Sequence, residues 1–172
     1  MRNFPYRTST LFAKEHFKSR KDLICVEIGV WKGENSKDIL DNLLNIKTLY
    51  LIDPWNKYSK YKDNKIFDNA LKVTRKRLKK YQSKIKIIRK ASDEAIKDIP
   101  NNIDFIYIDG NHKYKHVKQD IENYYKKLRK GGILAGHDIS WFPGVAKAFC
   151  EFIVKYKLDP IIRHMDWMVI KK

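Results

Sequence analysis

The sequence predicts an α/β fold in which helices cover both faces of a mostly parallel sheet and a C-terminal antiparallel hairpin closes that sheet. Short apolar runs alternate with segments of helical spacing, which is typical of successive β-α-β units. Each run is continuously apolar, as in strands that are covered on both faces. Two strand-like pieces follow the last predicted helix and are separated by a tight turn.

The chain has 172 residues, without an internal repeat or a Gly/Ser-rich or Pro-rich linker. This length suits one domain, which we expect to span residues 1–172. Within it, residues 21–172 would form the α/β core, and residues 1–20 would form a helical cover. The sequence leaves open whether that cover lies on a sheet face or over a ligand.

The elements follow in order along the chain. Five runs are the expected parallel strands: Leu23–Val30, Thr48–Ile52, Ile85–Ile88, Ile103–Ile108 and Gly132–Ala135. Apolar residues recur at helical spacing between and after these strands and predict four helices. The first carries Ile39, Leu43 and Leu44, the second Phe67, Leu71, Leu78 and Tyr81, and the third Val117, Ile121, Tyr124 and Leu128. The fourth spans Val145–Tyr156 and follows Pro143 and Gly144. The C-terminal hairpin would comprise Asp159–His164 and Trp167–Lys171.

The chain is strongly basic, with 37 Lys and Arg against 20 Asp and Glu and a formal net charge of +17. Such a charge attracts phosphates, nucleic acid and anionic surfaces. The excess is mainly Lys and is spread over nearly every segment, which favours a general compositional bias as its explanation. The charge alone therefore favours no partner.

No apolar run approaches the roughly 18 to 20 residues that span a bilayer, and the first residues lack the apolar region of a secretory signal. We therefore expect a cytoplasmic protein. Cys25 and Cys150 form no C-x-x-C pair, and Cys25 lies in an apolar run, so a buried, inert thiol is expected there.

Polar residues gather at the ends of the predicted strands. In open parallel sheets, ligands bind in the crevice beyond the carboxyl ends of the strands. The residues that end or directly follow strands are Glu27 and Gly29, Asp53, Asp109 with His112, and His137 with Asp138. Their common placement predicts one site at this edge of the sheet.

The segment from Glu27 through Gly29 to Gly33 predicts a cofactor loop. A strand that runs through a glycine turn into a helix brings backbone N–H groups close to a ligand. The dinucleotide fingerprint G-x-G-x-x-G is absent, which disfavours a nicotinamide oxidoreductase. Asp53 ends the next strand and is placed to bind both hydroxyls of a ribose, so a nucleoside-bearing cofactor fits.

A second cluster predicts a metal and a base. Asp109, His137 and Asp138 would lie on neighbouring strand ends and supply two carboxylates and an imidazole, which suits Mg²⁺ or Mn²⁺. His112 leaves the same rim, where an imidazole is a suitable general base.

The strings EIGVWKGENS, LYLIDPW, DFIYIDGNHKYKHVKQDIENYYKKLRKGGILAGHDI and FPGVAKAF resemble a family of small class I S-adenosylmethionine-dependent methyltransferases. They are similar to the metal-dependent sugar O-methyltransferases of macrolide biosynthesis and to cephalosporin-hydroxylase-like proteins. The resemblance covers about residues 23–150 and implies a seven-stranded, Rossmann-like methyltransferase sandwich.

The resemblance also implies roles for single residues. Glu27 and Gly29 would border the methionine end of S-adenosylmethionine, and Ser92 would lie by its adenine. Asp109 would lie beside the cofactor and the acceptor and would bind a metal together with Asp138. His112 would be the general base. His137 stands where the macrolide enzymes carry an acidic ligand.

The expected reaction is methyl transfer to a hydroxyl of a small molecule or of a sugar or glycan. Specificity would come from the N-terminal segment, from the Trp55–Asn64 loop or from a neighbouring subunit, since N-terminal aromatics make a homodimer reasonable.

Two alternatives remain open. One is methylation of RNA or another nucleic acid, supported by the basic segment Lys72–Lys80 and by Trp55, Tyr58 and Tyr61 among lysines. The other is a non-catalytic cofactor-binding module, although such a module has no need of titratable groups at the strand ends.

Overall fold

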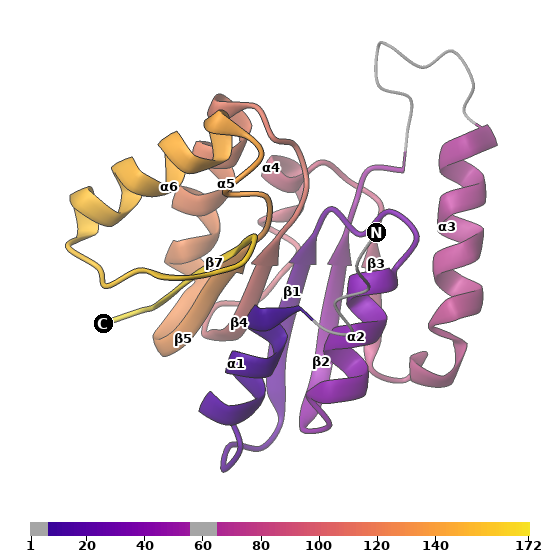
Figure 1. The fold of residues 1–172 in the computed structure, drawn as a ribbon. Helices are drawn as coiled ribbons and strands as arrows, with labels where there is room; N and C mark the ends of the chain where they lie inside the picture. Colours follow the sequence, from indigo (N-terminus) through magenta and orange to yellow (C-terminus); the bar gives the residue numbers. More distant parts are fainter. Residues whose placement is uncertain (1–6, 56–64) are drawn as a thin grey trace.

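The computed structural model describes residues 7–55 and 65–172, and these contain a seven-stranded sheet of order β3-β2-β1-β4-β5-β7-β6 (Figure 1). The strands are β1 (Leu23–Ile28), β2 (Ile46–Ile52), β3 (Ile85–Ile88), β4 (Ile103–Ile108), β5 (Leu128–Gly136), β6 (Ile161–Arg163) and β7 (Asp166–Ile170). Strands β1 to β5 pair in parallel, whereas β7 is antiparallel to β5 and to β6. The predicted fold class is confirmed, including its C-terminal hairpin.

Helices cover both faces of the sheet. They are α1 (Thr8–His16), α2 (Glu34–Asn42), α3 (Lys65–Arg77), α4 (Ser92–Ala95), α5 (Tyr114–Lys127) and α6 (Pro143–Tyr156), with a 3-10 turn η1 (Lys79–Tyr81). One apolar core lies between the sheet and α1, α2 and α3, and the other between the sheet and α4, α5 and α6. Both faces of β1 and β4 are thus buried, which explains why their sequences are predominantly apolar.

The described part of the N-terminal cover is helix α1, which packs against α2, β5 and β7 and so lies on a sheet face. Residues 1–6 of the predicted cover lie outside the described residues. The carboxylate of Asp166 fixes the first turn of α1, accepting hydrogen bonds from Thr8 Oγ1 (2.9 Å) and from the backbone N and Oγ of Ser9 (2.8 and 2.9 Å). The Tyr107 hydroxyl donates to the other oxygen of Asp166 (3.1 Å).

Five predicted helical positions lie beyond the α-helices: Leu43 and Leu44 follow α2, Leu78 and Tyr81 follow α3, and Leu128 follows α5. Leu128 begins β5 instead of ending α5, because the chain turns at this residue into extended backbone and pairs with Ile103. Leu44 lies beyond the end of α2 and is 74% exposed, so it is no part of the apolar stripe to which Ile39 belongs. In both cases, apolar spacing continued past the point where the helix stops.

No helix within residues 7–55 and 65–172 is both long and apolar enough to cross a membrane. Cys25 is fully buried, and burial raises the pKa of its thiol well above the ordinary value. The prediction of a buried thiol at this position is therefore confirmed. Cys150 is exposed, and neither cysteine forms a disulfide.

Candidate active site at the carboxyl ends of the strands

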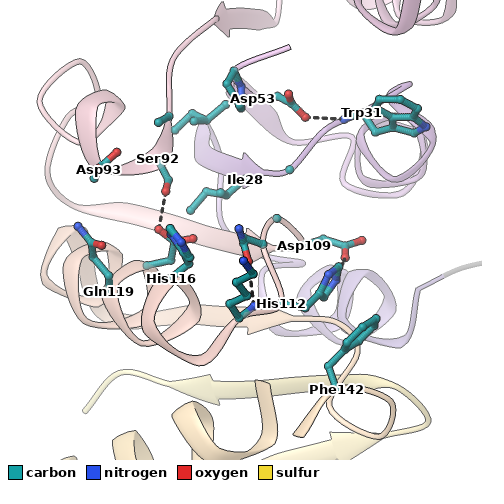
Figure 2. Close-up of a pocket in the computed structure, with 18 of the residues that line it drawn as sticks. Ile28, Trp31, Asp53, Ser92, Asp93, Asp109, His112, His116, Gln119 and Phe142 are labelled. Carbon is teal, nitrogen blue, oxygen red and sulfur yellow. Dashed lines mark hydrogen bonds and ion pairs between the residues drawn. The ribbon is translucent and has the colours of Figure 1, made fainter. Parts of the chain in front are cut away.

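A cavity of about 950 Å³ opens beyond the carboxyl ends of β1, β2 and β4. Its walls come from the loops after these strands, from the start of α4 and from the first turns of α5 (Figure 2). Among the predicted site residues, Gly29, Asp53, Ser92, Asp109 and His112 line it. One edge of the sheet therefore brings together residues that are up to 83 positions apart, as Gly29 and His112 are.

Gly29 allows two strand ends to meet. Its φ is +85°, a conformation that glycine adopts without strain. A Cβ at this position would lie 2.1 Å from the backbone oxygen of Asp109, so no larger residue fits without displacing the backbone. Asp109 is thereby held directly beside the turn that follows β1, with its backbone N donating to Ile28 O at 2.8 Å.

Asp53 is preorganised as an acceptor at the end of β2. The backbone N of Trp31 donates to its Oδ2 (2.9 Å), and the backbone N of Trp55 donates to its Oδ1 (2.8 Å). Burial raises the pKa of Asp53, and these N–H donors oppose the rise. Each oxygen retains a lone pair, so the carboxylate can still accept bonds from two ligand hydroxyls.

Ser92 begins α4 on another wall of the cavity. Its Oγ donates to Asp120 Oδ1 on α5 at 2.6 Å, and the Tyr124 hydroxyl donates to its backbone oxygen at 2.7 Å. Figure 2 shows Ser92 and Asp93 facing His116 and Gln119 of α5. These polar groups can recognise the edge of a ligand base.

Within the described part of the chain, Glu27, Gly33, His137 and Asp138 are not among the residues that line the cavity. Glu27 is 1% exposed, and its carboxylate accepts hydrogen bonds from Ser36 Oγ and from Asn35 Nδ2 (3.0 Å for the latter). Burial raises the pKa of Glu27 to about 8 against these bonds. Gly33 is the N-cap of α2, with φ +71°, and packs against Thr74, so it shapes the loop from behind.

The acidic and imidazole groups after β4 and β5 form one cluster. Ligand atoms of Asp109, His137 and Asp138 all lie within 4.8 Å of one another. His112 Nε2 lies 2.6 Å from Asp138 Oδ2 and 3.9 Å from Asp109 Oδ1. Asp138 itself has a left-handed backbone, with φ +65°, of the kind found at functional sites.

The charges of this cluster influence one another. Asp109 and Asp138 raise the pKa of His112 to about 9, despite its partial burial. Burial opposes the charge of Asp138, but hydrogen bonds from His112 and His137 hold its pKa well below the ordinary value. Two carboxylate oxygens and one imidazole nitrogen within this range suit Mg²⁺ or Mn²⁺, the latter accepting imidazole more readily. The residues fit the predicted metal.

Sequence patterns missed further residues at the site. The Phe142 ring stacks on His112, with centroids 4.2 Å apart and planes at 18°. Phe142 and Trp31 both line the cavity and are 39% and 43% exposed. Arg7 reaches Asp109 from the segment before α1. The position of Trp31 inside the glycine loop was an available signal, whereas nothing local to Arg7 or Phe142 pointed to the site.

Gly144 supports His112 from behind. A Cβ on Gly144 would lie 2.6 Å from the backbone oxygen of His112 and 2.8 Å from the backbone N of Tyr114. The first turn of α6 therefore packs directly on the loop that carries His112. This explains why a glycine follows Pro143 at that point of the chain.

Comparisons with known proteins give consistent results. An uncharacterised protein of Acanthamoeba polyphaga mimivirus is 34% identical over 144 residues, covering 78% of this chain and 61% of that protein. This chain thus spans less than two thirds of the length of that relative. The O-methyltransferase NovP has a similar fold, with a TM-score of 0.71 and 17% identity over 95% of this chain and 78% of that one.

A further solved structure with this fold is the SAH-bound methyltransferase of Podospora anserina, with a TM-score of 0.67 and 15% identity over 95% of this chain and 78% of that one. Residues 26–139 match a family model described as a methyltransferase domain. The match runs from β1 to the residue after Asp138 and so includes the glycine loop, Asp53 and the whole acidic and imidazole cluster. Since it covers more than half of the chain, this protein belongs to the methyltransferase domain family.

Proposed function

We propose that this chain transfers a methyl group from S-adenosylmethionine to a hydroxyl of a small molecule or of a sugar or glycan. The observation that carries the proposal is that one cavity is lined both by Asp53, a preorganised acceptor for ribose hydroxyls, and by Asp109 and His112. The first suits a nucleoside cofactor, and the second suits deprotonation of a hydroxyl.

The roles of the chain's own residues follow from their positions. Asp53 holds the ribose, Ser92 with its neighbours on α4 and α5 faces the base, and Gly29 leaves room for close approach. When bound, the cofactor supplies an electrophilic methyl carbon. The protein then has to align the acceptor oxygen with that carbon and remove its proton. His112, on the wall of the cavity, takes the proton in its neutral form, and the stacked Phe142 ring keeps the imidazole in place.

Asp109, His137 and Asp138 would hold a divalent ion, which would lower the pKa of an acceptor hydroxyl. His137 Nδ1 also lies 2.9 Å from Asp138 Oδ1, a contact that helps to position that carboxylate. The cluster thus contains both candidate ligands and the contacts that position them.

The nucleic-acid alternative loses one of its supports. Trp55 is fully buried, and its Nε1 donates to the backbone oxygen of Trp31 at 2.8 Å, so it cannot stack on a base. Tyr58 and Tyr61 lie outside the described residues. Steep salt dependence of RNA binding at physiological salt would favour that alternative.

Ligand-induced thermal stabilisation tests the proposed function. S-adenosylmethionine and its demethylated product S-adenosylhomocysteine are expected to raise Tm, and NAD is not, because a ligand that binds only the native state stabilises it. Each ligand is measured with and without Mn²⁺, followed by a screen of hydroxylated acceptors for methyl transfer. Stabilisation by NAD alone would refute the proposal.

A further inference from the structure

Two aromatic residues line the candidate active site without being buried in it. Phe142 follows β5 and Trp31 follows β1, and the two residues are 39% and 43% exposed. Large apolar side chains that stay exposed in a cavity are typical of ligand-binding sites. The nucleoside contacts proposed for Asp53 and Ser92 use neither ring. The two rings therefore indicate a second ligand in the same cavity.

Phe142 borders the place where the methyl acceptor has to bind. One face of its ring covers His112, with centroids 4.2 Å apart. Because His112 takes the acceptor proton in the proposed reaction, the acceptor oxygen has to lie within hydrogen-bond reach of that imidazole. The backbone N of Phe142 donates to Asp138 O at 3.1 Å and so fixes the turn that carries the ring. An acceptor at His112 therefore meets the exposed part of Phe142.

Trp31 borders the cavity from the opposite side of His112 (Figure 2). Its φ is +50°, a left-handed conformation that is rare for a bulky residue and persists only where the surrounding structure enforces it. Its backbone oxygen accepts hydrogen bonds from Trp55 Nε1 (2.8 Å) and Thr74 Oγ1 (2.9 Å). Its ring packs edge-to-face on Phe67, with centroids 5.9 Å apart. The loop thus presents a fixed aromatic ring to the cavity.

The two rings distinguish between classes of acceptor. A sugar carries several hydroxyl groups, and each of them needs a hydrogen-bond partner when it leaves water. A phenyl ring offers none and an indole offers one donor, so walls formed by Phe142 and Trp31 suit a sugar poorly. Aromatic rings gain affinity from packing on one another beyond the area that they bury. The lining therefore favours a small aromatic acceptor with few polar groups.

The chemistry of the step favours the same class. A phenol ionises near about pH 10, as a tyrosine side chain does, whereas a sugar hydroxyl is far less acidic. An imidazole therefore removes a phenolic proton more readily than the proton of a sugar hydroxyl. In the balanced step, the phenolic proton passes to His112 and the oxygen bonds to the methyl carbon. The bond between that carbon and the sulfonium sulfur breaks, and its electron pair stays on sulfur.

We propose that Phe142 and Trp31 border the acceptor subsite and that the acceptor is a small phenol whose ring packs on them beside His112. This inference rests on the proposed function, because it names the substrate class of the same site. It makes Phe142 and Trp31 specificity-determining residues, whereas the proton transfer stays with His112. The competing class is a sugar hydroxyl.

Three probes separate these classes. Catechol and cis-cyclohexane-1,2-diol both carry two neighbouring hydroxyl groups on a six-membered ring, but only catechol has an aromatic face. Methyl glucoside represents the sugars. Dissociation constants are measured by NMR titration of the whole chain, saturated with S-adenosylhomocysteine and Mg²⁺. The unaltered chain is expected to bind catechol most tightly of the three, and to methylate it when S-adenosylmethionine replaces the product.

Phe142→Leu tests the ring, because leucine keeps an apolar side chain but has no aromatic face. We expect the affinity for catechol to fall by about 3- to 10-fold, the range of an aromatic pair, and the affinity for cyclohexanediol to change by less than about 2-fold. The metal contributes equally before and after the substitution, so the difference between the two probes reports the aromatic contact. A purely structural role, such as support of His112, would change both affinities alike.

Trp141→Leu is the matched control. Trp141 precedes Phe142 in the chain and is 71% exposed, but it is not among the described residues that line the cavity. Its substitution should leave the affinities for all three probes unchanged. If Phe142→Leu does not fold, Trp31→Leu replaces it, and the same selective loss is expected because Trp31 borders the other side of the subsite.

The outcomes are distinct. Equal losses for catechol and cyclohexanediol, no binding of catechol, or preferred binding of the glucoside would overturn the aromatic subsite while leaving the proposed function in place. If the unaltered chain did not bind S-adenosylhomocysteine, the proposed function would fall, and this inference with it. A selective loss of affinity for catechol supports both.

Discussion

His112 Nε2 lies 2.6 Å from Asp138 Oδ2, which joins the loop after β4 to the end of β5 across the candidate active site. The contact fixes the imidazole on one side, and the ring of Phe142 covers its face at 4.2 Å. An imidazole held in this way can meet a substrate proton at a defined position. His112 is therefore the group whose removal should affect the chemical step most.

We expect His112→Gln to lower kcat by about 10²-fold or more while changing S-adenosylhomocysteine affinity only a few-fold, as for loss of a general base. Single-turnover rates and calorimetry measure the two effects separately. His16→Gln is the control, because His16 lies on α1 and contacts Gly131 O, away from the cavity. An unchanged kcat in His112→Gln, with an identified acceptor, would remove the assignment of the base.

Asp109→Asn tests the metal. A neutral amide at this position is a poorer metal ligand, and we expect Mn²⁺ affinity to fall by about tenfold or more. Loss of a group that only orients a metal ligand already lowers metal affinity by that much. The measurement is calorimetric titration of Mn²⁺ into the metal-free chain. Asp159→Asn is the control, since its carboxylate is 90% exposed and pairs with Lys172. Equal Mn²⁺ affinity in the chain and in Asp109→Asn would contradict the role of Asp109.

Gly29→Ala tests the close approach of β1 and β4. The methyl group would overlap the Asp109 backbone at 2.1 Å and require a positive φ, so we expect a loss of at least about 2 kcal/mol, or roughly 4–8 °C in Tm. Gly110→Ala is the matched control. Its nearest atom would be Ile28 Cγ2 at 3.6 Å, an ordinary contact, and its Tm should change little. Similar Tm values for the two variants would show that the backbone there can relax.

The fold could be predicted from the sequence because its signals are local. Predominantly apolar runs marked β1 and β4, and those runs are buried on both faces. The ends of elements were less predictable. Leu128 fits the α5 stripe by spacing, yet it pairs with Ile103 in the sheet. Pairing between residues that are distant in sequence decides such a boundary, and local periodicity does not contain it.

The candidate site was predictable where it follows from strand ends. Asp109, His137 and Asp138 cluster because parallel strands β4 and β5 end at the same edge. Arg7 was not predictable, since its contact with Asp109 spans 102 positions and depends on how α1 packs. Gly33 was expected to bind cofactor by its place in the loop, but it lies behind the loop against Thr74.

Glu27→Gln tests the cost of burying a carboxylate. Burial raises the pKa of Glu27 from an ordinary 4.5 to about 8, so the native chain keeps a proton that the unfolded chain loses in this range. The contribution of protonated Glu27 to the free energy of unfolding is complete below about pH 4.5 and is lost as the pH rises through about 8. The slope is at most about 1.4 kcal/mol per pH unit.

Glutamine cannot ionise, and Ser36 and Asn35 can still bind its amide. The unfolding free energy of Glu27→Gln, from urea titrations between pH 5 and 8, should therefore rise steadily relative to that of the unaltered chain. Glu15→Gln, at an exposed position, should give a curve parallel to that of the unaltered chain. A parallel curve for Glu27→Gln as well would mean that Glu27 stays ionised in the native state, stabilised by Ser36 and Asn35 more strongly than burial opposes it.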